Sequence, residues 1–389
     1  MNGVAPVSRR LGAQWGWTGR ALVRDLVVEI DASGQVLSME QEAGQPHGLL
    51  SPGLINAHTH LELGARTVPG GDGMVPWVAA LLRGRGDDDE RAAARRGIEA
   101  LRAAGTVGVV DISNTGASLG PLSESGLSAS VMGELIGWSE ALWGPALARI
   151  GDWPAGERLA VQSTPHSLIG CAAALVRAAL QSPGRAPVGW SPRRTLHCDE
   201  SPDDAPLLQS QSGPWADWLR GMGRPFEAVI SRAASGVMAL DEAGLLDDRL
   251  ALVHLVTARP ADLDRVAARG AMAILCPRSN LHITGLLPPV AAMAERGIGL
   301  ALGTDSLASN SDLDVLEEAR LLARRFSSLP RALWMEALTA GGATVLGDPA
   351  RGHLRVGGRP GLVRFDLPAT DDPLRALLLG EPVARECVS

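Results

Sequence analysis

The sequence predicts an α/β protein, a (β/α)8 barrel of the TIM type with a small β domain built from both chain ends. Three observations lead to this prediction. From residue 54 onward, short apolar stretches with strand character alternate with helical stretches rich in Ala, Leu and Arg. Both ends of the chain carry β patterns without a helical period. The length of 389 residues accommodates a barrel of about 250 residues and a smaller companion.

The expected elements follow in chain order. A hairpin at residues 22–30 and 31–37, with a Ser-Gly turn, places residues 1–52 in the small β domain. The barrel occupies residues 53–347, and residues 348–389 return to the small domain. The eight barrel strands are expected at residues 54–58, 108–112, 128–134, 159–164, 195–198, 250–255, 271–276 and 298–303.

Helical patterns lie between and after these strands. Residues 88–104 and 260–269 read as helices, and in the second one Leu and Val recur at helical spacing. Residues 312–326 and 331–346 are expected to form two further helices after the last strand. The tail at 352–366 returns to β character, with strands at 354–356 and 362–365 around a Gly-Gly turn, so we expect it to pair with the N-terminal strands.

Composition excludes several classes of function. A net charge of −7 and a pI of about 5.7 argue against a nucleic-acid polymer as partner. The four cysteines show no Cys-x-x-Cys spacing, no export pattern opens the chain, and no apolar run reaches about 18 residues. We therefore expect a cytoplasmic protein with reduced thiols that contacts no membrane.

Two residue types are missing altogether. The sequence contains no lysine, so Schiff-base chemistry, a Walker-type phosphate loop and a metal bridge through a carboxylated lysine are excluded. Tyrosine is also absent, so no phenol can act as an acid or a base. Tryptophan, with ten residues, is the main large aromatic side chain.

Two histidines end the first barrel strand. His58 and His60 are two residues apart, so on a strand their imidazoles point to the same face. Neutral imidazole is the commonest metal ligand in proteins, and a pair of this kind can bind one ion. A His-x-His pair alone is weak evidence, because structural histidines produce it often. The interpretation depends on further ligands at other strand ends.

Such residues recur downstream. His197 and Glu200 follow the fifth strand, His254 lies in the sixth, and Asp305 follows the eighth. Each one alone has a structural reading that is favoured by about two to one: a core histidine bonded to backbone, or a carboxylate that caps the next helix. Their joint placement at the carboxyl ends of the strands, where barrel active sites lie, reverses that preference.

The motifs around these residues resemble a known family. Residues 52–60 (Pro-Gly-Leu-Ile-Asn-Ala-His-Thr-His), 276–281 (Cys-Pro-Arg-Ser-Asn-Leu) and 303–306 (Gly-Thr-Asp-Ser) are similar to motifs of the amidohydrolase superfamily. The neighbouring residues resemble its metal-dependent deaminase and triazine-hydrolase (chlorohydrolase) branch, and residues 58–63 also resemble the aminodeoxyfutalosine deaminases. The tail at 357–363 departs from the family pattern, with Arg where Lys is usual and Pro-Gly in place of Ala-Asp. That difference concerns a turn and leaves the chemistry unaffected.

The resemblance implies a metal-dependent aminohydrolase. It assigns one divalent ion, zinc or alternatively iron, to His58, His60, His197 and Asp305. Asp305 would accept a proton from water, His254 would hydrogen-bond the attacking oxygen, and Glu200 would shuttle protons to the substrate. The expected substrate is a purine-like or related aminated heterocycle that loses ammonia. Two alternatives stay open: a chloro-triazine or cyclic amide hydrolase with the same site, and a non-catalytic metal-binding barrel.

Further residues are candidates for binding the substrate. His166 resembles a substrate-binding histidine of the family, with helix capping as the alternative. Trp77 could stack on a heterocycle, as could Trp138 and Trp143, although ordinary packing is the favoured reading for each. The remaining candidates are Glu62, which could equally support the ligands from behind, Arg278, which could pair with an anionic group, and Asn280. A homodimer is the candidate assembly.

Overall fold

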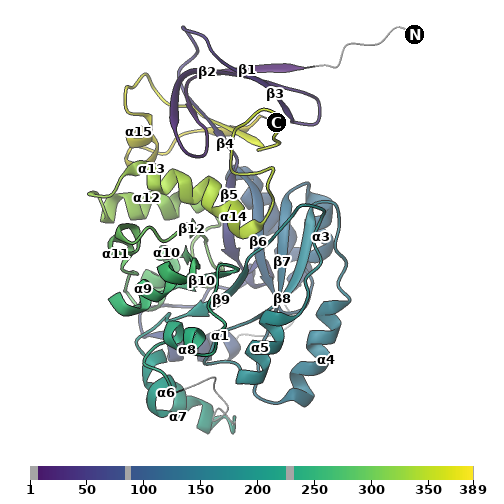
Figure 1. Ribbon diagram of the computed structural model, residues 1–389, viewed down its shortest axis with the longest axis vertical. Coiled ribbons are helices and arrows are strands. Elements are labelled where there is room, and N and C mark those ends of the chain that lie inside the picture. The colour runs from purple at the N-terminus through teal and green to yellow at the C-terminus, as the bar shows by residue number, and fades with distance from the viewer. Residues whose placement is uncertain (1–7, 84–88, 225–231, 389) are drawn as a thin grey trace.

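A computed structural model describes residues 8–83, 89–224 and 232–388 of the chain (Figure 1). It confirms an α/β fold with parallel sheets and contains each of the eight expected strands, with ends that shift by a few residues. One parallel sheet has the order β5-β6-β7-β8 and the other the order β12-β11-β10-β9. The strands of these two sheets are β5 (Leu54–Thr59), β6 (Thr106–Ser113), β7 (Ser128–Leu135), β8 (Leu159–Pro165), β9 (Arg194–Cys198), β10 (Leu250–His254), β11 (Met272–Leu275) and β12 (Leu300–Leu302).

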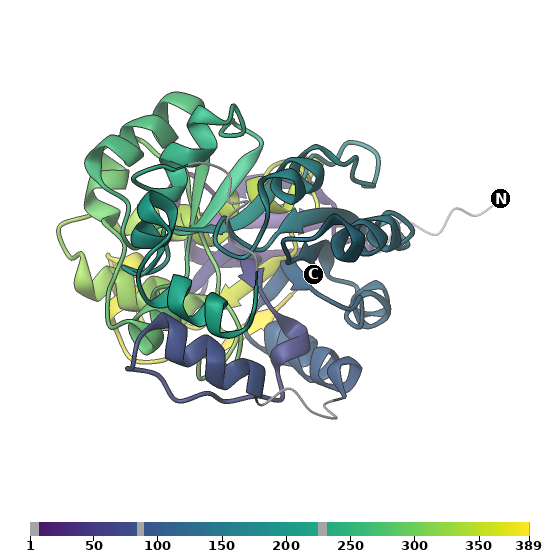
Figure 2. The same ribbon diagram turned by 90° about the horizontal axis from the view of Figure 1, so that it is seen from below.

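Isolated parallel bridges join the two sheets at both edges. Thr59 pairs with Asp305 between β5 and the end of β12, and Ser167 pairs with His197 between β8 and β9. Nearly every residue of these eight strands is buried, as is typical of parallel strands covered on both faces. The strands therefore lie at the centre of the molecule, and helices surround them (Figure 2).

The surrounding helices follow the expected alternation. In α9 (Pro260–Arg269), Pro260 at the first turn, the Arg259–Asp262 capping pair and a left-handed Gly270 fix both ends. The other helices up to β12 are η1 (Leu61–Leu63), α1 (Met74–Arg83), α2 (Glu90–Ala103), α3 (Leu119–Ser125), α4 (Glu140–Gly151), α5 (Ala173–Gln181), α6 (Asp204–Ser210), α7 (Pro214–Gly221), α8 (Gly236–Glu242), α10 (Pro277–Ile283) and α11 (Val290–Glu295). The helix expected at 88–104 is α2, and residue 88 itself lies outside the described residues.

Two expected helices after β12 differ in detail. The one expected from residue 312 begins later, as α12 (Val315–Arg325), because the Asp314 side chain caps it by accepting a hydrogen bond from the Leu316 amide. The one expected at 331–346 is interrupted: α13 (Arg331–Glu336) and α14 (Gly342–Leu346) flank a π-helical turn, η2 (Ala337–Gly341). At this turn a Cβ on Gly341 would lie 2.0 Å from the Leu300 carbonyl oxygen, so helix and strand backbones approach closely.

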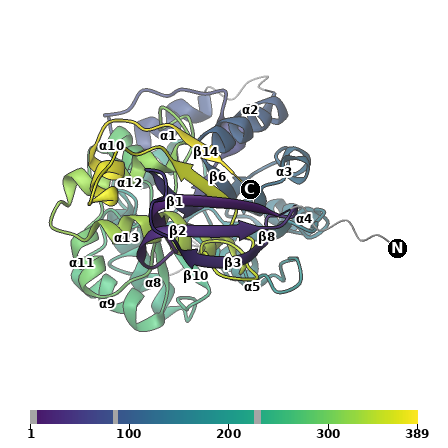
Figure 3. The ribbon, with the colours of Figure 1, turned by 90° about the horizontal axis from the view of Figure 1, so that it is seen from above.

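Strands from both chain ends form a six-stranded sheet with the order β14-β13-β4-β1-β2-β3, seen from above in Figure 3. The β2–β3 hairpin is antiparallel as predicted, and β13 pairs antiparallel with β4, from Leu362 opposite Pro52 to Phe365 opposite Leu49. The strands are β1 (Arg9–Trp17), β2 (Leu22–Ile30), β3 (Val36–Gln41), β4 (Leu49–Pro52), β13 (Leu362–Phe365) and β14 (Arg385–Cys387).

The prediction of a strand at residues 354–356 was wrong. That segment makes only single contacts with its neighbours, such as the 3.0 Å hydrogen bond from the Leu354 amide to the Thr18 carbonyl, so no ladder forms. The helix α15 (Pro373–Leu379), capped by the side chain of Asp372, was not predicted. In the described part of the chain, no helix has the length and apolarity to cross a membrane.

We expect the Gly303→Ala substitution to destabilise the fold beside β5. A Cβ at residue 303 would lie 2.6 Å from the Cβ of His58 and 2.7 Å from its carbonyl oxygen, so β5 and the end of β12 would have to separate. Overpacking of this kind lowers the free energy of unfolding by about 1–3 kcal/mol. Denaturant unfolding measures the change. Gly151→Ala is the control, because a Cβ there meets nothing within 4 Å, and equal stability of the two variants would contradict the prediction.

Candidate active site

A cavity of about 460 Å³ opens at the carboxyl ends of the strands. Its polar lining residues gather around the strand ends: His60, Asn114, Glu134, His166, His197, Glu200, Asp204, Asp305 and Ser306, among others. Helices α1 and α7 and the segments after β7 and β8 supply a wall that is largely apolar. Its members include Leu63, Met74, Trp77, Val78, Leu81, Ile136, Trp138, Leu142, Ile169, Trp215, Trp218 and Leu219.

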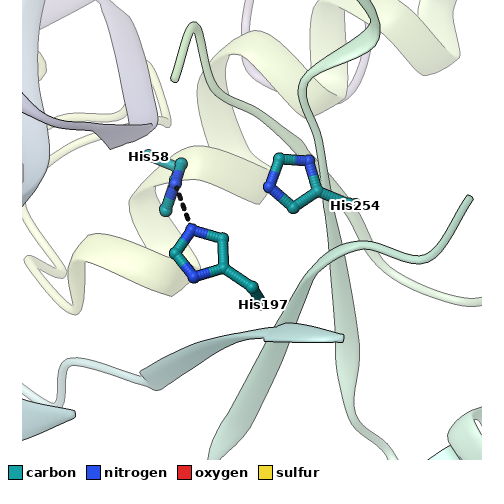
Figure 4. A group of neighbouring side chains, drawn as sticks. All are labelled: His58, His197 and His254. Atoms are coloured by element: carbon teal, nitrogen blue, oxygen red, sulfur yellow. Dashed lines mark hydrogen bonds between the residues drawn. The ribbon is translucent and has the colours of Figure 1, made fainter. Parts of the chain in front are cut away.

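His60, His197 and Asp305 line the floor of this cavity, and the buried His58 lies against them. The Nε2 atoms of His58 and His197 lie 3.3 Å apart (Figure 4). The Oδ1 atom of Asp305 lies 3.8 Å from Nε2 of His58 and 3.5 Å from Nε2 of His60. All four residues are buried. The four expected ligands, which come from three separate parts of the sequence, are therefore brought together.

Backbone geometry at the strand ends positions these side chains. The amides of Thr304 and Asp305 both donate to the His58 carbonyl at 3.0 Å, which ties the end of β12 to β5. Asp305 has a φ of 56° and His254 a φ of 78°. Non-glycine residues rarely adopt this left-handed region, and such strain clusters at functional sites. The strands therefore turn sharply where their polar side chains enter the cavity.

The Asp305 carboxylate is held in its charged form. Burial raises its pKa, but the nearby His60 and His254 and the hydrogen bond from Ser279 outweigh burial, so the net pKa is lowered. Ser279 and Ser309 donate to its Oδ2 atom at 2.6 and 3.0 Å. Its Oδ1 atom remains directed at the histidines.

His58, His197 and His254 are neutral at pH 7. Burial is the largest cause: it lowers the pKa of His197 to about 4 and that of His254 to about 3, and it brings the pKa of His58 well below its usual value. The Nδ1 atom of His197 lies 2.8 Å from the His166 carbonyl oxygen and donates to it, which leaves the lone pair on Nε2 facing His58.

Glu200 and His254 form a second pair beside the four ligands. The Oε1 atom of Glu200 lies 3.3 Å from Nε2 of His254. Burial raises the pKa of Glu200 well above its usual value, which favours the protonated carboxyl group over the carboxylate. The side-chain amide of Asn280 donates to Nδ1 of His254 at 3.0 Å, which places the imidazole proton on the Nε2 atom that faces Glu200.

The candidate substrate-binding residues separate into two groups. His166, Trp77 and Trp138 line the cavity, and the His166 ring lies 4.7 Å from that of His197 between centroids. Trp143 is buried and is not among the cavity-lining residues. Asn280 is buried behind His254 and acts on that histidine, so its contact is with the site rather than with the cavity.

For Arg278 and Glu62 the geometry corrects the expectation of substrate contact. The Arg278 guanidinium makes two hydrogen bonds to Asp312, at 2.8 and 2.7 Å, and lies 3.7 Å from Glu318. Neither Arg278 nor Glu62 is among the residues that line the cavity. The Glu62 carboxylate accepts hydrogen bonds from Ser113 and from three backbone amides of the loop after β6. Glu62 thus stabilises the chain around His60 and the loop after β6. This supporting role is the alternative to substrate binding that the sequence left open.

The structure adds residues that sequence reasoning missed. Asp204 accepts hydrogen bonds from the Glu200 amide at 2.8 Å and from the Trp215 indole at 3.1 Å, so it connects the segment after β9 to the apolar wall. Glu134, one residue before the end of β7, lines the cavity beside His197. The available signal for Glu134 was the same as for the ligands: a lone carboxylate that closes an apolar strand.

The donor set fits a divalent cation. Ligand atoms of His58, His60 and Asp305 lie within 4.8 Å of one another, as do those of His58, His197 and His254. The Nε2 atoms of His58 and His197 are hydrogen-bonded at 3.3 Å, and those of His58 and His60 face one carboxylate oxygen of Asp305, so nitrogen and oxygen donors surround a common point. Imidazole and carboxylate suit zinc and other divalent transition metals.

Fold and site together define a hydrolase of the metal-dependent class, and comparison with known proteins gives the family. A model described as the amidohydrolase family matches residues 227–384. The chain is 30% identical over 325 residues to an aminodeoxyfutalosine deaminase of Deinococcus radiodurans, which covers 79% of this chain and 75% of that protein. It is 28% identical over 392 residues to a 5-methylthioadenosine/S-adenosylhomocysteine deaminase of Halobacterium salinarum, covering 90% and 81%.

Solved structures share the fold. An aminofutalosine deaminase of Helicobacter pylori, in complex with methylthio-coformycin, has a TM-score of 0.81 at 21% identity and covers 96% of this chain and 97% of its own. An adenosine deaminase of Xanthomonas campestris with bound zinc has a TM-score of 0.74 at 24% identity, covering 95% and 88%. The chain belongs to the amidohydrolase family, as its motifs indicated, and is a hydrolase that acts on C–N bonds.

We expect the metal-free protein to lose stability as the pH falls from about 6.5 towards 4. The pKa values of His197 and His166 are lowered to about 4 in the folded chain, from 6.5. Between these values the unfolded chain binds more protons, which favours unfolding by about 1.4 kcal/mol per pH unit for each such histidine. Urea unfolding of chelator-treated protein at about pH 7, 6 and 5 measures the slope. Stability that is constant over this range would contradict the prediction.

Proposed function

We propose that this protein is a metal-dependent aminohydrolase that removes ammonia from a purine-like or related aminated heterocycle by hydrolysis. The observation that carries the proposal is the convergence of His58, His60, His197 and Asp305 directly beside the Glu200–His254 pair, at the floor of a cavity. A cage for a cation and a protonated acid within reach of the same space are the two components that hydrolytic deamination requires.

His58, His60, His197 and Asp305 would hold one divalent cation. Zinc is the favoured metal, with iron as the alternative; bound zinc in the similar Xanthomonas deaminase supports zinc. When bound, such a cation provides Lewis-acid chemistry and a water molecule of lowered pKa as the nucleophile.

The chain's own groups handle the protons. Asp305, whose pKa is lowered, is a carboxylate and accepts the proton of the attacking water. The Nε2–H group of His254 donates a hydrogen bond to the oxygen that adds to the ring carbon. Glu200, whose pKa is raised, gives its proton to the adjacent ring nitrogen, then takes the proton of the added hydroxyl group and passes it to the departing amine. The proton held by Asp305 returns to Glu200 at the end of the cycle. A C–O bond forms, the C–N bond breaks, and the products are a ring carbonyl compound and ammonia.

The cavity favours a nucleoside over a nucleotide. Tryptophans and aliphatic side chains cover its outer wall, and among the described lining residues Arg224 is the single arginine. A phosphate group needs a cluster of donors or cations, which these residues do not supply. Relatives named as deaminases of aminodeoxyfutalosine and of 5-methylthioadenosine/S-adenosylhomocysteine support a nucleoside that carries no phosphate group. His166 and Trp77 are proposed to contact the heterocycle.

We propose the same architecture that the sequence indicated. The bridges at both sheet edges support a single (β/α)8 barrel at residues 53–347, and the mixed sheet of β1–β4, β13 and β14 supports a small domain built from residues 1–52 and 348–389. A cytoplasmic location and a homodimer remain predictions of the sequence.

A product-specific screen tests the proposal. The protein is loaded with zinc and incubated with aminated nucleobases, with adenosine and its 5′-thioether derivatives, and with futalosine-type nucleosides that carry an amine, while ammonia release is measured. We expect ammonia from at least one nucleoside and little from the corresponding nucleotides. Chloride release from a chloro-triazine, or ring opening of a cyclic amide, without any ammonia would replace the proposal with one of the two hydrolase alternatives.

We expect Glu200→Gln to lower turnover by about 10²–10⁴-fold while the protein keeps its metal. Glutamine preserves the size of the side chain but has no proton to transfer. Steady-state rates and metal content per chain measure the two effects. Glu295→Gln, at an exposed position on α11, is the control and should retain full activity. Undiminished turnover in Glu200→Gln would remove the assigned proton donor.

A further inference from the structure

Glu134 is a buried acid for which the deamination chemistry gives no role. It lies one residue before the end of β7, and only 3% of its side chain is exposed. Its carboxylate accepts one hydrogen bond, from the side-chain amide of Asn114 to Oε2 at 2.8 Å. The other oxygen, Oε1, is buried and has no hydrogen-bond partner in the described part of the chain.

The nearest basic group is a metal ligand. The Oε1 atom of Glu134 lies 3.9 Å from Nδ1 of His197, and no arginine of the described residues forms an ion pair with it. His197 gives this oxygen no hydrogen bond, because its Nδ1 atom donates to the His166 carbonyl oxygen at 2.8 Å. A carboxylate that is buried and only half bonded is unfavourable unless a positive charge lies close by. Within the protein alone, that charge is missing.

Two other roles fit the geometry less well. Glu134, His166 and His197 lie close enough together to suggest a second cation site. However, the Nδ1 atom of His197 already donates to the His166 carbonyl, and its Nε2 atom faces His58, so neither nitrogen is left for another ion. Direct binding of substrate by Oε1 is also disfavoured, because that atom is shielded from solvent.

We propose that Glu134 is a positioning residue that places a buried negative charge behind His197 and thereby strengthens the binding of the divalent cation. A carboxylate close to a ligating imidazole makes the nitrogen that binds the metal a better electron-pair donor. The positive ion in turn compensates the buried negative charge of the carboxylate. This inference rests on the proposed metal site, and it concerns how tightly that site holds its ion.

The proposal predicts different effects of one substitution in the metal-free and the metal-loaded protein. Glu134→Gln removes the charge but keeps the acceptor for Asn114. In the metal-free protein an uncompensated buried charge disappears, so the unfolding midpoint should rise or stay where it is. In the loaded protein the compensating charge disappears, so we expect cation affinity to fall by about 10–100-fold. A merely structural carboxylate would lower the metal-free midpoint instead.

The experiment measures zinc affinity by competition with a chelating dye, and thermal unfolding with and without zinc, for the full chain. Asp348→Asn is the matched control, because Asp348 is a buried acid near the start of β7 whose charge is already paired with Arg351 at 3.5 Å and which also accepts from Ser128. It should lower the metal-free midpoint and leave zinc affinity unchanged. Glu134→Asp, which keeps the charge, should recover part of the affinity lost in Glu134→Gln.

Three outcomes would overturn the inference. They are unchanged zinc affinity in Glu134→Gln, a joint fall of affinity and metal-free midpoint, and a stoichiometry of two ions per wild-type chain that drops to one in Glu134→Gln. A wild-type chain that binds no divalent ion would instead remove the proposed metal site itself. These results are distinguishable because the first three all require a wild-type chain that binds metal.

Discussion

The whole site depends on one constraint: ionisable groups that are buried away from water need a hydrogen bond or an opposite charge nearby. His58, His60, His197 and Asp305 are all buried at the ends of apolar strands, and the three imidazoles face inward towards one another. Neutral imidazoles and a single charged carboxylate can share such a space only if hydrogen bonds or a cation satisfy their lone pairs. Ser279 and Ser309 donate hydrogen bonds to the Oδ2 atom of Asp305. The Oδ1 atom of Asp305 faces the Nε2 atoms of His58 and His60.

The same constraint explains how two buried acids acquire different protonation states. Asp305 is surrounded by histidines and hydroxyl donors, which favour the carboxylate. Glu200, whose side chain is 16% exposed, has lost most of its hydration and lies beside the carboxylates of Asp305 and Asp204, which favours the protonated acid. Environment alone thus separates a proton acceptor from a proton donor a short distance apart, the arrangement that hydrolytic chemistry at neutral pH needs.

The strands and the cluster of His58, His60, His197 and Asp305 could be predicted from the sequence because both produce local signals. Eight apolar stretches stand out against Ala- and Arg-rich helices, and a histidine or aspartate at the end of such a stretch is conspicuous. The role of Arg278 could not be read in this way, because its partners, Asp312 and Glu318, lie more than 30 residues further along the chain. The π-helical turn at Ala337–Gly341 depends likewise on close backbone packing against β12, which no local pattern reveals.

The two junctions between the parallel sheets lie next to the proposed metal site. At each junction an isolated β-bridge includes one proposed metal ligand: Thr59 pairs with Asp305 on one side, and Ser167 pairs with His197 on the other. His58 and His60 belong to one sheet, whereas His197 and Asp305 follow strands of the other. The proposed ion, held by all four, would therefore connect two sheets that share few backbone hydrogen bonds, and separating the sheets would also release it.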